Sequence, residues 1–133
     1  MPQTINKETQ NDQRIARSIA FMSQHLNTPL RVTQLAKMAN LSSSYFWALF
    51  KQETGYAPVD FLIRLRMSQA CYLLDSTNLA VKKIAAVLGY KDALYFSRMF
   101  KSFSGVAPTH YRERTDREPV LPKLALQEES LTE

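Results

Sequence analysis

Residues 35–61 read LAKMANLSSSYFWALFKQETGYAPVDF, and residues 84–111 read IAAVLGYKDALYFSRMFKSFSGVAPTHY. The two stretches repeat one pattern, because a Tyr-Phe pair, a Phe-Lys pair, a glycine and an Ala-Pro dipeptide recur in the same order about fifty residues apart. Each copy indicates a short helix, a tight turn and a longer helix that ends at a glycine. This is the outline of a helix-turn-helix unit, and the chain contains two copies of it.

The periodicity of apolar residues outside the repeats is also helical, and no segment shows the alternation of a strand. We therefore predict an all-α fold of seven helices, in which two three-helix lobes share a long connector helix at about 58–75. The helix-turn-helix units are expected at about 33–54 and 81–104. In the first half of the chain we predict helices from Asn11 or Asp12 to about 26, from a Thr33 cap to about 39, and from a Ser42 cap to 54. The second of these helices is expected to bury Leu35, Ala36 and Met38. The later helices are predicted from Pro58 to about 75, from 81 to 88, from an Asp92 cap to 104, and from Pro108 to 114.

Charge divides the chain of 133 residues, whose net charge is +5, into a basic part and an acidic end. Residues 1–115 hold fifteen Lys and Arg against seven Asp and Glu, whereas residues 116–133 hold two against five and include two prolines. We predict a flexible N-terminus at 1–11, a folded domain at 12–115 and a disordered acidic tail at 116–133. A basic domain suits nucleic acid, an anionic membrane surface or an acidic protein, and charge alone does not choose among them.

The remaining composition excludes several classes of protein. The single cysteine, Cys71, forms no internal disulfide and fits a reducing compartment. There is no apolar signal core and no run of about 20 apolar residues, so we expect a cytoplasmic protein without a membrane partner. No catalytic constellation, phosphate-binding glycine loop or cluster of metal ligands is present, so we expect no enzyme, cofactor or metal.

A helix-turn-helix reads DNA because its first helix braces the second, whose free face enters the major groove. Removing the apolar positions leaves an outer face on each recognition helix: Ser43, Ser44, Trp47, Ala48 and Lys51 in the first unit, and Ala93, Leu94, Tyr95, Ser97, Arg98 and Lys101 in the second. Arg98 is the best candidate for base readout, since a guanidinium matches O6 and N7 of guanine. Lys51 and Lys101 are expected to contact phosphates. The helix N-termini at 42–44 and 92–94 are expected to offer N–H groups to phosphate as well.

The block from Gly89 to Lys101, followed by Gly-Val-Ala-Pro at 105–108 and Tyr-Arg at 111–112, resembles the DNA-binding domain of the AraC/XylS regulators. Residues 50–55 and 64–67 share in the resemblance, which covers about 12–114. It implies a monomeric domain whose two units enter successive major-groove segments of an asymmetric site, and transcription control by activation through RNA polymerase. It places base contacts at Ser44, Trp47, Ala48, Ala93, Leu94, Tyr95 and Arg98, and backbone contacts at Ser43, Tyr45, Lys51 and Lys101.

The first recognition helix departs from the family pattern. Relatives often carry an arginine or another polar reader where this chain has Trp47 and Ala48, so we expect direct readout by the first unit to be weaker and to rely on thymine methyl groups and one indole N–H. This departure keeps an alternative open, in which the chain is a helical adaptor that binds RNA polymerase or another protein. Most members of the family also carry a sensor domain, so the chain is either a short regulator without one or a piece of a longer regulator.

Overall fold

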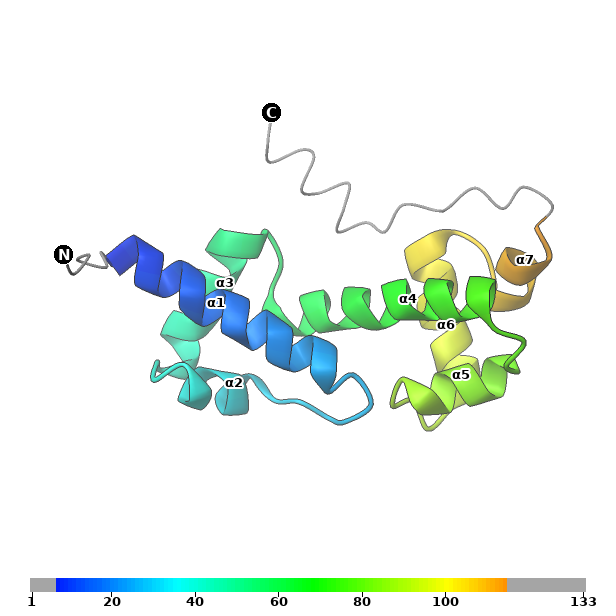
Figure 1. Cartoon of the computed structure of the whole chain (residues 1–133), viewed down its shortest axis with the longest axis horizontal. Helices are drawn as coiled ribbons and strands as arrows, with labels where there is room; N and C mark the ends of the chain where they lie inside the picture. Colours follow the sequence, from blue (N-terminus) through cyan, green and yellow to red (C-terminus); the bar gives the residue numbers. More distant parts are fainter. Residues whose placement is uncertain (1–6, 115–133) are drawn as a thin grey trace, which may run out of the picture. The chain divides into compact units, whose positions relative to one another are not determined.

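The structure is a computed structural model that describes residues 7–114. This part of the chain holds seven α-helices and no strand, which confirms the all-α prediction (Figure 1). The helices are α1 (Lys7–Gln24), α2 (Val32–Met38), α3 (Ser43–Thr54), α4 (Pro58–Ser76), α5 (Val81–Val87), α6 (Ala93–Ser104) and α7 (Pro108–Glu113). None of the described helices combines the length and the apolar character that crossing a membrane requires. The tail predicted at 116–133 lies outside the described residues.

Contacts divide the described chain into two compact units. The first comprises residues 7–25 and 30–62, and the second comprises residues 26–29 and 63–114. Helix α4 begins in the first unit and continues into the second without a break. Each unit therefore holds one pair of helices with the helix-turn-helix order, α2–α3 in the first and α5–α6 in the second.

The first unit is built around α3, against which α1 and α2 both pack. Phe46 and Phe50 are fully buried on the inner face of α3, and the ring of Phe50 meets that of Phe61 edge to face, with centroids 5.2 Å apart. The other buried apolar residues of this unit are Ile15, Met22, Leu35, Ala36, Leu49 and Leu62. Two aromatic side chains one turn apart thus place one face of α3 in the core. The opposite face of the helix is exposed to solvent.

Both recognition helices begin and end where the sequence indicated. Ser42 caps α3 by accepting a hydrogen bond from the Tyr45 N–H at 3.2 Å, and α3 ends at Gly55, whose φ is +85°. Asp92 caps α6, which ends at Gly105 with a φ of +92°. A side-chain acceptor at the start and a left-handed glycine at the end satisfy backbone groups that a helix otherwise leaves unpaired.

Three local predictions were wrong. Helix α1 begins at Lys7, so residues 7–11 are helical rather than loose, because a polar segment of good helix formers extended the amphipathic pattern. Helix α2 begins at Val32, so Thr33 lies inside the helix and the N-cap is Arg31, whose N–H donates to the Gln34 side chain at 3.4 Å. Met38 is 53 % exposed, because the buried face of α2 is narrow, consists of Leu35 and Ala36, and does not extend to the last residue of the helix.

In the second unit, α5, α6 and α7 gather around the C-terminal part of α4 (Figure 1). Met67, Ala70, Cys71 and Leu74 of α4 form one buried cluster with Ile84, Ala85 and Leu88 near α5, with Phe96, Phe100 and Phe103 of α6, and with Tyr111 of α7. The Phe100 and Tyr111 rings meet edge to face, with centroids 5.4 Å apart. Three phenylalanines thus anchor the inner face of α6 in the core, and α7 packs against the same face.

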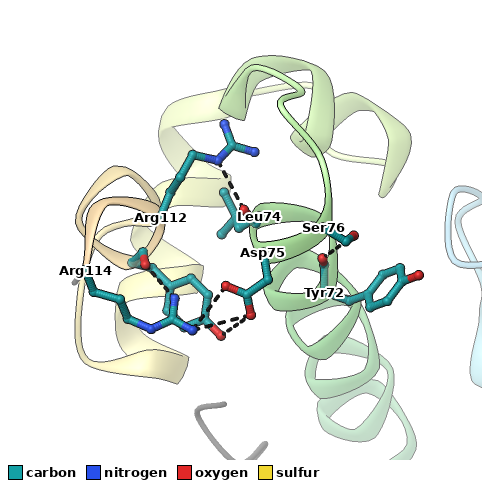
Figure 2. A network of polar contacts seen from close by, with 7 residues as sticks. Tyr72, Leu74, Asp75, Ser76, Arg112 and Arg114 are labelled. Carbon is teal, nitrogen blue, oxygen red and sulfur yellow. Dashed lines mark hydrogen bonds and ion pairs between the residues drawn. The ribbon is translucent and has the colours of Figure 1, made fainter. Parts of the chain in front are cut away.

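Polar contacts fasten α7 to the end of α4 (Figure 2). Asp75 accepts a hydrogen bond from the Tyr111 hydroxyl at 3.2 Å and forms an ion pair with Arg114 at 3.1 Å. Arg112 donates to the Leu74 carbonyl oxygen through Nε and to the Thr77 carbonyl oxygen through its terminal nitrogen, each at 3.3 Å. These donors occupy carbonyl groups at the C-terminal end of α4, where positive charge is favourable.

The buried Tyr111 hydroxyl makes the protein less stable at alkaline pH. Burial raises the pKa of Tyr111 above its ordinary value of about 10, and burial likewise raises the pKa of Cys71 beside it. Above about pH 10 the unfolded chain therefore binds fewer protons than the native chain, so the free energy of unfolding must fall as pH rises. We expect a lower urea midpoint at about pH 10.5 than at about pH 8, and Tyr111→Phe should reduce that difference. Tyr72→Phe, which alters an exposed tyrosine of α4, is the control and should leave the difference intact.

Candidate nucleic-acid interface

The outer face of α3 carries the residues that the sequence predicted for DNA contact in the first unit. Ser43, Ser44, Ala48 and Lys51 are exposed, and Tyr45 is 40 % exposed. Trp47, the largest side chain of this face, is 43 % exposed, so it does not pack fully into the core. These side chains share one helix whose other face is buried, and they are therefore available to a ligand at the same time.

Two further features of this face were not foreseen. The Lys51 ammonium lies 5.3 Å from the centroid of the Trp47 ring, an attractive cation–π geometry between residues one helical turn apart. A hollow of about 400 Å³ lies beside Trp47, with Val32, Ser43 and Ser44 as its other lining residues. Sequence reasoning missed Val32 because it belongs to α2 rather than to the recognition helix.

The outer face of α6 carries the corresponding residues of the second unit. Leu94 is 71 % exposed, Tyr95 is 51 % exposed, and Arg98 and Lys101 are exposed as well. Ala93 differs from this prediction because it is half-buried and packs against the core cluster. Within residues 7–114 the guanidinium of Arg98 has no hydrogen-bond or ion-pair partner. All five donors of this side chain are therefore available to an external acceptor.

The N-terminus of α6 does not offer the phosphate site that the sequence suggested. One carboxylate oxygen of Asp92 accepts the Leu94 N–H at 2.9 Å and the Tyr95 N–H at 3.4 Å. These N–H groups are already occupied, and the carboxylate opposes the approach of a phosphate. In α3, the neutral hydroxyl of Ser42 occupies one N–H group, that of Tyr45. The two recognition helices thus differ in charge where each one begins.

Within the second unit, the loop before α2 contacts both α4 and the turn before α6. Arg66 of α4 donates to the Leu26 carbonyl oxygen at 2.9 Å and to the Thr28 carbonyl oxygen at 3.0 Å. Gly89 lies so close to this loop that a Cβ atom added to it would stand 3.1 Å from the Asn27 carbonyl oxygen. Gly89 precedes the Asp92 cap, and so this contact fixes the backbone that leads into α6.

Comparison with known proteins identifies the family. A family model described as a helix-turn-helix domain matches residues 35–114. This span contains most of the first helix-turn-helix unit, all of the second, and the blocks that carry the AraC/XylS resemblance. The chain belongs to the AraC/XylS family. Members of this family are transcription regulators with a DNA-binding domain of this type.

Individual relatives agree with this assignment. The MmsAB operon regulatory protein of Pseudomonas aeruginosa is 38 % identical over 95 residues, which cover 71 % of this chain and 31 % of that protein. The C-terminal domain of AraT, a response regulator from Geobacillus stearothermophilus, superposes with a TM-score of 0.71 at 30 % identity and covers 87 % of this chain and 97 % of that one. The DNA-binding domain of AdpA, a global transcriptional factor solved in complex with a target DNA, gives the same TM-score and identity over 74 % of this chain and 89 % of that one. The chain spans about a third of the length of the curated relatives it matches.

Proposed function

We propose that this chain is a sequence-specific DNA-binding transcription regulator that inserts α3 and α6 into successive major-groove segments of one asymmetric site. The observation that best supports the proposal is the pairing, in each unit, of a buried aromatic face with an exposed face of hydrogen-bonding, aromatic and basic side chains on the same helix. A helix with its side chains is about as wide as the major groove, which is about 12 Å across. The protein acts in the cytoplasm as an activator, binds DNA as a monomeric domain, and contacts RNA polymerase.

The proposal divides the exposed residues into two roles. Base contacts are assigned to Ser44, Trp47, Ala48, Ala93, Leu94, Tyr95 and Arg98, and backbone contacts to Ser43, Tyr45, Lys51 and Lys101. Ala93 has the smallest share among the base contacts because it is half-buried against the core cluster. Phosphate contacts set the position of the protein on the duplex, and base contacts select the sequence.

The decisive experiment selects bound sites from random duplexes and then maps protection on the best site. The proposal expects one protein per asymmetric site of about twenty base pairs, because two units on one face of DNA span about two helical turns. Two chains on a palindrome would contradict it. A steep loss of affinity with salt and a retained sequence preference are also expected. Binding without sequence preference would favour a helical adaptor that contacts another protein.

The two lysines of the recognition helices should differ when each is changed to alanine. Lys101→Ala should weaken all duplexes to a similar extent and lower the slope of log K against log salt by about one unit, because a phosphate contact is blind to sequence. Lys51→Ala should do the same and also alter base preference, since Lys51 covers the Trp47 ring. Binding isotherms on the selected site and on a scrambled duplex at several salt concentrations measure both effects. A change in base preference for Lys101→Ala would contradict the assignment.

A further inference from the structure

The hollow beside Trp47 is a shallow apolar depression on the reading side of the first unit. Its lining brings together the first residue of α2, Val32, with Ser43, Ser44 and Trp47 from the first turns of α3. Val32 is half-buried, whereas Ser43 and Ser44 are exposed and Trp47 is 43 % exposed. The depression therefore adjoins the residues assigned above to DNA contact and belongs to the same surface.

The chemistry of the lining decides what fits there. A branched aliphatic side chain, an indole and two hydroxyl groups line the hollow, and no charged side chain is among them. The lining itself therefore offers a phosphate no positive charge, and the Lys51 ammonium lies against the Trp47 ring outside it. The one apolar group that a base edge presents in the major groove is the methyl group at C5 of thymine. An apolar depression on a recognition helix is thus complementary to a pyrimidine 5-methyl group.

We propose that this hollow reads pyrimidine 5-methyl groups, with Val32 and Trp47 as the specificity-determining residues. The inference rests on the proposed function, because it requires α3 to enter the major groove. It extends beyond thymine, since 5-methylcytosine carries the same methyl group. Thymine presents an acceptor at position 4 and methylcytosine presents a donor there, and a serine hydroxyl pairs with either. The first unit accepts both methylated pyrimidines and discriminates against cytosine and uracil.

Lys51 acts on this reader as a positioning residue. Its ammonium lies 5.3 Å from the centroid of the Trp47 ring, and the two residues are one turn apart on α3. A cation held over the ring restricts the rotamers of a side chain that is otherwise only partly packed. The indole is therefore held in place as a wall of the hollow before DNA arrives.

The test uses the best duplex from the random-site selection, in which single thymines of the half read by the first unit are replaced by deoxyuridine. Loss of one buried methyl group should weaken binding about fourfold at one position. At the same position, 5-methylcytosine should bind about fourfold more tightly than cytosine. Val32→Ala and Trp47→Ala should each bring the thymine-to-uracil affinity ratio close to one, and Lys51→Ala should lower it.

Two controls separate this reader from a general loss of affinity. Val59→Ala, which changes a 54 % exposed valine outside the hollow, should leave the thymine-to-uracil ratio intact. Lys51→Arg retains a cation for the indole and should leave the ratio intact as well. A half-site without a uracil-sensitive thymine, or a ratio unchanged in both Val32→Ala and Trp47→Ala, overturns this inference while sequence-specific binding stands. Loss of every sequence preference in the wild-type protein overturns the proposed function itself.

Discussion

Replacing Gly89 with alanine should lower the free energy of unfolding by about 2–5 kcal/mol, whereas Gly105→Ala should lower it by about 1–2 kcal/mol. The two glycines form a matched pair, because their φ angles are +90° and +92° and each follows the end of a helix. The left-handed backbone conformation penalises any Cβ by the same amount at both positions. A difference between the two variants therefore reports something other than backbone strain.

That difference has a steric origin in the structure. A Cβ atom at Gly105 would meet nothing within 4 Å, whereas one at Gly89 would stand 3.1 Å from the Asn27 carbonyl oxygen and 3.2 Å from the Leu26 carbonyl oxygen. Relief requires the loop to move by a few tenths of an ångström. Arg66 opposes that movement because it donates to the Leu26 and Thr28 carbonyl groups. The crowding at Gly89 therefore adds to the conformational penalty.

Urea unfolding of the two single variants measures the difference. The Arg66→Ala variant, with and without Gly89→Ala, tests its cause. In an Arg66→Ala background the loop is freed, so Gly89→Ala should cost less than it does in the wild-type background, with a coupling of about 1 kcal/mol. Equal losses for Gly89→Ala and Gly105→Ala would show that the loop yields without resistance. An unchanged loss in the Arg66→Ala background would assign the crowding to other neighbours.

Local signals in the sequence predicted the recognition helices because the residues that start, end and bury them are close together in the chain. Ser42, Asp92, Gly55 and Gly105 act within four residues of the backbone groups that they satisfy or bend. The start of α1 and the exposure of Met38 were mispredicted, because each depends on a weak pattern at the margin of a helix. The intrinsic helix propensities of single residues are too small to fix the first or last residue of a helix.

Contacts between distant segments left no readable signal. Gly89 and Asn27 are adjacent in space, and so are Tyr111 and Asp75, yet nothing in their sequence spacing indicates that they meet. The repeat also gave no indication that Val32 lines a surface hollow. Val81 occupies the equivalent first position of α5, and it packs against the core of its own unit. A residue type that recurs at one repeat position favours a shared structural role. Only the structure places Val32 beside Trp47 in a surface hollow.

The two reading faces are unequal, and this predicts where sequence preference resides. Arg98 of α6 occupies the repeat position that Ala48 occupies in α3, so at this position one recognition helix carries a guanidinium and the other carries a methyl group. A bidentate contact to guanine discriminates by about 1–3 kcal/mol, while removal of one buried methyl group costs about 0.8 kcal/mol. Base preference should therefore be concentrated in the half that the second unit reads.

Arg98→Ala should weaken binding to the selected site by about 5- to 150-fold and flatten preference at one base position, because a bidentate pair to O6 and N7 of guanine is lost. Affinity for a scrambled duplex should fall only slightly. Arg98→Lys keeps the charge but loses the planar fork, so it should lose the same base preference while retaining nonspecific affinity. Lys101→Ala removes one positive charge from the same helix and is the matched control, with equal loss on both duplexes. Competition binding against duplexes with each base at the mapped position measures these effects. If Arg98→Ala weakens both duplexes equally, Arg98 contacts phosphate, and the preference of the second half must then come from Leu94 and Tyr95.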